Sequence, residues 1–325
     1  IFPTRLLGSA IGLSALTVAF GIAAGPSIGG LILHLASWPW LFAINVPVGL
    51  LALFLAIRSL PREPARRARF DVWGALLSIV MLSGSVFALD QFGHGGGGTM
   101  ALITLALALA CLVGFVYRQR HVASPLVPLA LFEEPRFAFA AVTSMFAFLA
   151  QGIAFVGLPF LYQTVMGVSP IASALLFTPW PLVIMVIGPV AGRLADKGNP
   201  ALISSLGLGL FLLGMLALTG LDADSRYLDV IWRTALCGVG YGLFQAPNNR
   251  EMIGSVPLAL SANASGVLAS VRTFGQSLGT ALVGLIPGLS FGSLTLSLWL
   301  GCISVVVALA LSLYRVPLAA RDRRG

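Results

Sequence analysis

The chain has 325 residues, of which 58% are hydrophobic and 9% are charged, and its mean hydropathy is +0.97. A soluble domain is nearer to half apolar and a quarter charged, so this composition excludes a soluble protein and requires lipid as the surrounding solvent. The net charge of +8 does not indicate nucleic-acid binding, because the arginines stand in short tracts between apolar runs and not on one face of a folded domain.

Ten stretches are long and apolar enough to cross a membrane as helices, since a span needs about 20 largely apolar residues. The sequence therefore predicts an all-α integral membrane protein with spans at 9–35, 38–57, 71–92, 100–117, 138–165, 172–192, 200–220, 229–249, 264–287 and 292–314. Most of the 19 lysines and arginines fall in the termini and in one set of alternating connections. By the positive-inside rule these segments are cytoplasmic, so both termini are expected in the cytoplasm.

The first expected span contains the sequence GIAAGPSIGG, from Gly21 to Gly30. Gly21, Gly25 and Gly29 recur every four residues, so they share one helix face and let a second helix approach closely. Pro26 removes an intrahelical hydrogen bond and bends the axis. The stretch predicts a kinked, closely packed helix. A phosphate-binding loop is excluded, because no Lys-Ser/Thr ending follows and Pro26 has no N–H.

The second span opens with Trp38, Asn45, Pro47 and Gly49 in the run WPWLFAINVPVG. Together the two stretches resemble the antiporter motif, and the run that follows it, in the fourteen-span drug:proton antiporters of the major facilitator superfamily. The resemblance extends over essentially the whole chain. It implies a major facilitator-type helical bundle in the bacterial-type cytoplasmic (inner) membrane.

In that family the antiporter motif lies on the fifth helix, so we expect this chain to lack counterparts of the family's first four helices. The resemblance assigns residues 1–58 to the last two helices of the N-terminal half-bundle and 59–137 to a linker region with two extra transmembrane helices. Residues 138–325 then form the C-terminal six-helix half-bundle and a cytoplasmic tail. The family's first-helix acid, main cytoplasmic loop motif and fourth-helix arginine have no counterpart in this interpretation.

The two extra spans consist almost entirely of Leu, Ala, Val and Gly, which is typical of helices that face lipid or lie at the periphery. Asp90 is an internal acid near the outer end of the first of them. It is a weak candidate for a proton site, and an acid at the membrane interface explains the same position. His94 follows in a glycine-rich turn without partner ligands for a metal.

The six spans that begin at residue 138 carry more Pro, Gln, Asn and Gly, a composition typical of helices that line a transport cavity. Gln151 and Phe155 lie one turn apart, and Trp180 stands between two prolines. Amides and aromatic rings around a kink suit hydrophobic and cationic ligands through stacking and cation–π contacts. Ordinary packing explains each of these residues equally well.

The run GRLADK resembles the second-half version of the superfamily's cytoplasmic loop motif. The resemblance assigns a cytoplasmic gate to Gly192, Arg193, Asp196 and Lys197. We expect Asp196 to cap the next helix or to pair with Arg193. A tight turn with charged ends is the alternative.

The span at 229–249 places Tyr241, Gln245 and either Asn248 or Asn249 at helical spacing near its inner end. Several amides on one stripe favour the lining of a cavity or a gate over simple contacts between helices.

The following span carries Arg272 and Gln276 one turn apart, and Gly275 and Gly279 form another small-xxx-small pair. An arginine at this depth is costly unless it faces a cavity or a partner. Arg272 is therefore a candidate for the central pathway. Snorkelling of its side chain to the cytoplasm is the alternative.

These features predict a secondary active transporter that exports hydrophobic or cationic drugs in exchange for protons by alternating access. A truncated, transport-inactive membrane remnant or scaffold is the alternative. An enzyme is not expected, because His34, His94 and His121 stand apart and form no catalytic or metal-binding group. The expected partners are the lipid bilayer, small substrates and protons, with no cofactor and no nucleic acid.

Overall fold

The computed structural model describes residues 36–59, 71–93, 98–122, 125–285 and 294–321, with scattered positions between 11 and 35. The regular elements in this part of the chain are helical. They are α2 (Trp40–Ala43), α3 (Asn45–Ser59), α4 (Val72–Gly93), α5 (Gly98–His121), η2 (Leu129–Glu133), α6 (Pro135–Thr164), α7 (Pro170–Phe177), α8 (Pro179–Lys197), α9 (Pro200–Thr219), α10 (Tyr227–Gly254), η3 (Leu258–Leu260), α11 (Ser261–Leu285) and α12 (Leu294–Arg321). Many residues of the expected first span lie outside the described part of the chain, Pro26 and Gly30 among them.

Prolines and polar caps set where several helices begin. Helices α6, α7, α8 and α9 each have proline in the first turn, where the missing N–H has no intrahelical partner in any case. Ser169 caps α7 by accepting from the Ala172 N–H at 3.2 Å. Asn199 caps α9 by accepting from the N–H groups of Ala201 and Leu202. These local signals divide a nearly continuous apolar sequence into separate helices.

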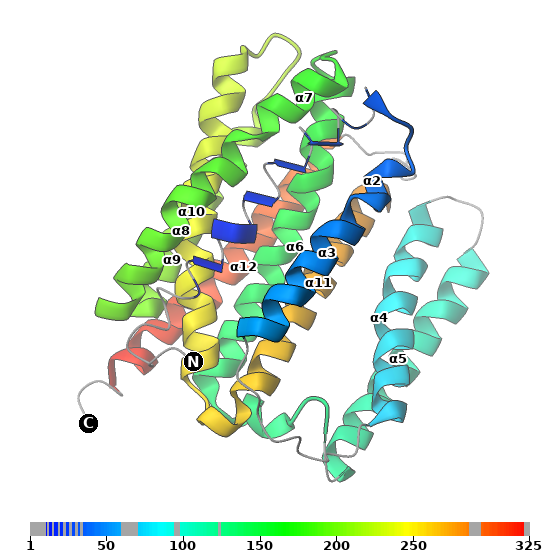
Figure 1. The fold of residues 1–325 in the computed structure, drawn as a ribbon, viewed down its shortest axis with the longest axis vertical. Coiled ribbons are helices and arrows are strands. Elements are labelled where there is room, and N and C mark those ends of the chain that lie inside the picture. Colours follow the sequence, from blue (N-terminus) through cyan, green and yellow to red (C-terminus); the bar gives the residue numbers. More distant parts are fainter. Residues whose placement is uncertain are drawn as a thin grey trace.

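Helices α6 and α8 to α12 form one bundle (Figure 1). Helix α6 packs against α11 and α12, whereas α10 packs against α8 and α9, and α9 also contacts α12. The largest buried side chains, which include Trp180, Phe211 and Tyr241, lie where these helices meet. The core of the described structure is therefore in the second half of the chain.

Helices α4 and α5 form a hairpin that stands beside the bundle, with α4 in contact with α11 (Figure 1). Asp71, just before α4, accepts from the Gly74 N–H at 2.9 Å and from Arg118 Nε on α5 at 2.6 Å. Burial raises the pKa of Asp71, but the hydrogen bonds from Gly74 and Arg118 outweigh it and hold the pKa below its ordinary value. The hairpin was expected to face lipid or lie at the periphery; it lies at the edge of the bundle, and α4 turns one face to α11.

Seven helical segments among the described residues are long and apolar enough to cross a membrane, or eight if one bent pair counts as a span. The seven agree with seven of the expected spans. The expected spans 229–249 and 264–287 are α10 and α11, which qualify as a pair bent by 116°. Charged residues such as Arg233, Arg250 and Glu251 lower the hydropathy of α10. A multi-pass helical membrane protein is confirmed, and the count of ten spans stays a prediction.

Candidate functional site

Three helices exchange hydrogen bonds at mid-length of the bundle. Gln151 Oε1 on α6 accepts from the Tyr241 hydroxyl on α10 at 2.9 Å and from Gln276 Nε2 on α11 at 2.8 Å. Tyr241 is fully buried, Gln151 is 4% exposed, and Gln276 is half-buried. Each residue lies more than about 13 Å from either end of its helix at 1.5 Å per residue. The structure thus brings three of the expected cavity residues into one group, here called the central triad.

Arg272 lies one turn before Gln276 on α11. Its Cζ atom is 5.9 Å from the centroid of the Phe148 ring on α6, within the range of a cation–π contact. Arg272 stands about 16 Å along α11 from its first residue. Its guanidinium therefore meets a ring at mid-length of the neighbouring helix.

Edge-to-face aromatic rings continue from the central triad towards α8. Tyr241 lies 5.4 Å from Phe211, Phe211 lies 5.6 Å from Trp180, and Trp180 lies 5.7 Å from Phe155, all between ring centroids. Trp180, Phe211 and Tyr241 are fully buried. Trp180 and the Tyr241 ring therefore belong to the packed core, whereas the Tyr241 hydroxyl belongs to the central triad.

The two remaining expected cavity residues of α10 have different environments. Asn248 is fully buried and donates through Nδ2 to the Ala140 carbonyl at 3.2 Å and to Ser144 Oγ at 2.6 Å. These bonds tie α10 to α6, which is the helix–helix role that sequence reasoning placed second. Gln245 is half-buried.

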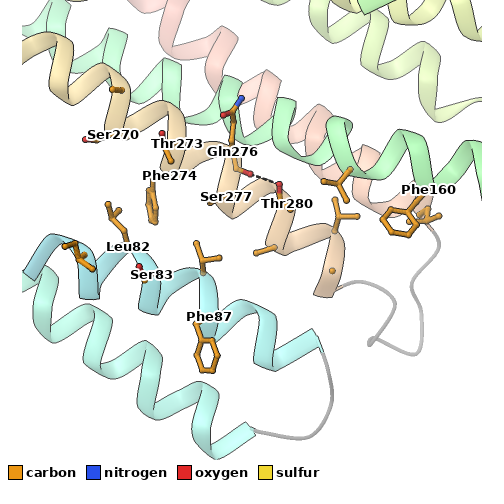
Figure 2. A pocket seen from close by; sticks show the side chains of 18 residues that line it. Leu82, Ser83, Phe87, Phe160, Ser270, Thr273, Phe274, Gln276, Ser277 and Thr280 are labelled. Carbon is orange, nitrogen blue, oxygen red and sulfur yellow. Dashed lines mark hydrogen bonds between the residues drawn. The ribbon is translucent and has the colours of Figure 1, made fainter. Parts of the chain in front are cut away.

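A cavity of about 1300 Å³ lies between α4 and the bundle, bounded by α4, α6, α11 and α12 (Figure 2). Leu82 and Ser83 of α4 and Thr273 of α11 line it, and Phe274 projects from α11 toward α4 (Figure 2). None of the described lining residues is charged. Gln276 also borders the cavity, so the cavity adjoins the central triad through this one side chain.

A buried charge cluster joins α6, α10 and α12. Glu251 Oε1 accepts from Arg136 Nε at 3.3 Å, and Glu251 Oε2 forms an ion pair with Arg315 Nη1 at 3.4 Å. The side chains of Glu251 and Arg315 have no exposed surface. Arg315 Nη2 also donates to Ser312 Oγ at 3.0 Å. Sequence reasoning missed this cluster, although an acid at the end of an amide-rich helix with arginines in two other segments was a usable signal.

The predicted gate loop lies at the end of α8. Gly192 is buried, whereas Arg193 and Lys197 are exposed. Asp196 Oδ1 accepts from Arg250 Nε of α10 at 3.0 Å. The expectation that Asp196 caps the next helix is wrong, because the asparagine at the start of α9 supplies that cap. The gate role of the loop stays a prediction.

The described part of the GIAAGPSIGG stretch is largely exposed. No described atom lies within 4 Å of a Cβ built on Gly21 or Gly25, and a Cβ on Gly29 would meet the Leu41 side chain at 3.7 Å. No residue of α3 is buried. The close partner expected for this glycine face is therefore not among the residues that the structure describes.

The residues of the following run surround the break between α2 and α3. Trp38 precedes α2 and is 67% exposed. Asn45 Nδ2 donates to the Leu41 carbonyl across the break at 3.2 Å. Pro47 lies in the first turn of α3, and a Cβ on Gly49 would meet no described atom within 4 Å. Ile44 at the break keeps helical dihedral angles, so α2 and α3 form one apolar segment, Trp40–Ser59, long enough to cross a membrane.

Asp90 lies near the C-terminal end of α4, and its side chain is outside the described part of the structure, so its role as a proton site stays a prediction. Across the described ranges, no group of three or more His, Cys, Asp or Glu residues is arranged to hold a metal ion.

Comparisons with known proteins agree on one family. The family model described as Major Facilitator Superfamily matches residues 1–280. The uncharacterized transporter YebQ of Escherichia coli (strain K12) is 40% identical over 320 residues, which cover 97% of this chain and 70% of that protein. The riboflavin transporter RibZ of Clostridioides difficile is 30% identical over 285 residues, 86% of this chain and 61% of RibZ.

A third relative is the tetracenomycin C resistance and export protein of Streptomyces glaucescens, which is 32% identical over 308 residues. The match covers 92% of this chain and 56% of that protein. The chain thus spans between 56% and 70% of the length of these three relatives.

Proposed function

Because the chain belongs to the major facilitator superfamily, we propose that it is a secondary active transporter that exports small hydrophobic or cationic molecules in exchange for protons by alternating access. The transporter and export names of the relatives support transport as the activity. Of these names, only that of the tetracenomycin C protein indicates a direction, which is outward. We also propose the fourteen-span drug:proton branch, because the glycine–proline stretch and the run after it carry that resemblance.

The proposed topology puts both termini on the cytoplasmic side of a bacterial-type inner membrane. The alternation of basic connections supports this orientation. Residues 1–58 are the proposed end of the first half-bundle, 59–137 the linker region with its hairpin, and 138–325 the second half-bundle. The packing of α6 with α11 and α12, and of α9 with α10 and α12, supports the last of these units.

The observation that best supports the proposal is that Gln276 belongs both to the cavity lining and to the central triad. Its side chain borders a cavity of about 1300 Å³, whose described lining residues are uncharged, and also donates to Gln151 in the central triad. A ligand in the cavity that offers a better acceptor to Gln276 would loosen the link between α6 and α11. Differential contacts of this kind are what a ligand needs to shift a conformational equilibrium. Ligand binding would thus be coupled to movement of the helices that form the central triad.

The experiment measures export in everted membrane vesicles that contain the full chain and are energised to build a proton gradient. A fluorescent lipophilic cation and an uncharged hydrophobic dye serve as substrates. We expect uptake into the vesicles that stops when a protonophore dissipates the gradient. Gln276→Leu should lower the uptake rate at least about tenfold. The variant loses the hydrogen bond to Gln151 and with it the link between ligand binding and the conformational equilibrium.

Gln163→Leu is the matched control, because Gln163 is exposed on α6 and donates only to the Pro159 carbonyl of its own helix. It should transport like the unaltered chain. Absence of gradient-dependent uptake by the unaltered chain would refute the proposal and favour the inactive remnant or scaffold.

A further inference from the structure

The guanidinium of Arg272 is a positive charge at mid-length of the bundle. Its Cζ atom lies 5.9 Å from the centroid of the buried Phe148 ring, and Gln276 follows one turn further along α11. An arginine at this depth in a membrane is costly, faces the interior of the bundle or a cavity, and marks a functional site unless a partner neutralises it.

No described acidic side chain forms an ion pair with Arg272. On α10, Asp229 and Glu251 each stand about 15 Å or more along the helix from Tyr241, and Glu251 is held by Arg136 and Arg315. On α6, the acid Glu134 is the cap of the first turn and accepts from the Arg136 N–H. The described helices around Arg272 therefore bring it aromatic and amide groups but no counter-charge.

The same contacts act against a cationic ligand in this half of the protein. The Phe148 ring, which could attract a cation, already lies against the Arg272 guanidinium. Trp180 and Phe211 are fully buried in the core. Nearby cations repel each other strongly in a medium of low dielectric constant. The electrostatics of this site thus differ from those expected from its aromatic composition alone.

We propose that Arg272 binds the anionic group of an amphipathic organic anion, whose apolar body occupies the cavity between α4 and α11. The guanidinium presents a planar fork of donors that matches a carboxylate. Arg272 is not among the described lining residues of the cavity, but Gln276, one turn away on α11, is one of them and links the two regions. This inference rests on the proposed transport function and replaces the cationic substrates proposed there with amphipathic anions.

The test uses two xanthene dyes of similar size and opposite charge, a carboxyfluorescein-type anion and a rhodamine-type cation. Their binding to the purified full chain is measured by fluorescence anisotropy. The unaltered chain should bind the anion more tightly than the cation. Arg272→Gln should weaken binding of the anion about 10- to 100-fold, the range of a hydrogen bond to a charged group, and should not weaken binding of the cation. Arg272→Lys should retain most of the preference for the anion.

Arg226→Gln is the matched control, because it removes the same charge from an exposed position at the start of α10. It should leave both affinities unchanged. Thermal unfolding of each variant identifies any loss of fold, and Arg272→Lys keeps the test valid if Arg272→Gln is unstable. Equal loss of both dyes in Arg272→Gln, or failure of the unaltered chain to prefer the anion, would overturn the proposal.

The same dyes in everted vesicles separate this inference from the proposed function. Anion-selective binding without gradient-dependent transport would leave the inference standing and refute the transport function. Transport of both dyes with no effect of Arg272→Gln would refute the inference and leave the transport function standing.

Discussion

Replacement of Gly275 by alanine is expected to separate α11 from α6 and to disturb the central triad. A Cβ at Gly275 would lie 2.7 Å from the Met145 carbonyl oxygen and 3.1 Å from Phe148 Cβ, whereas ordinary contacts begin at 3.4 Å. Helix α11 must therefore move away by about 0.7 Å, which is a form of overpacking. The next residue is Gln276, and the same shift would stretch its 2.8 Å bond to Gln151 to about 3.5 Å, where a hydrogen bond is largely lost.

The expected cost of Gly275→Ala is about 1–3 kcal/mol from overpacking, offset by up to about 1 kcal/mol from the better helix propensity of alanine. Gly266→Ala is the control on the same helix, because a Cβ there would meet no described atom within 4 Å. Gly266→Ala should be stabilised by the higher helix propensity of alanine and should not be destabilised by overpacking.

The assay is thermal unfolding of both variants in detergent, followed by intrinsic tryptophan fluorescence, together with the vesicle transport rate. Gly275→Ala should melt below the unaltered chain and transport more slowly, whereas Gly266→Ala should melt at the same temperature or above it. Equal stability and equal transport of the two variants would refute the argument that the α6–α11 contact positions the central triad.

Three further predictions concern the two charge clusters and the first glycine face. Glu251→Gln leaves the buried Arg315 without its counter-charge, so the free energy of unfolding in detergent should fall by about 3–5 kcal/mol. The exposed Glu133→Gln should not change it, and equal stability of the two variants would contradict the reasoning. The pKa of Asp71 is held below its ordinary value, so its carboxylate adds stability that is present above the pKa of an unfolded aspartate and is lost as the pH falls through the folded-state pKa. The melting temperature should therefore fall between about pH 6 and about pH 3 in the unaltered chain and fall less in Asp71→Asn. An equal fall in both proteins would contradict the stabilising role of the Asp71 carboxylate. Gly25→Val should stop transport without preventing membrane insertion, because a branched side chain blocks close approach on the glycine face; efflux at the unaltered rate would show that this face has no tight partner.

Local patterns were sufficient where the physical cause is local. The apolar runs predicted helices because a backbone in lipid must satisfy its hydrogen bonds internally, and seven of the expected spans are confirmed. The pair Gly275 and Gly279 was expected to allow close packing, and Cβ atoms there would collide with the backbone of α6 at Met145 and Leu149.

Local patterns were insufficient where a residue's role depends on which helix faces it. The spacing of Tyr241, Gln245 and Asn248 predicted one polar stripe along α10. In the structure Tyr241 donates to Gln151 in the central triad, whereas Asn248 donates to the Ala140 carbonyl. The two side chains therefore contact different parts of α6.

The sequence by itself determined that this protein is helical and lies in a membrane, and it indicated the family through the glycine–proline stretch and the run after it. Tertiary structure decided that Gln151 meets Gln276, that Glu251 meets Arg315, and that α4 walls a cavity against α11. The reason is physical. Hydropathy and small-residue spacing are properties of one segment, whereas an ion pair or a cavity depends on the rotation and depth of two helices that stand far apart in the chain.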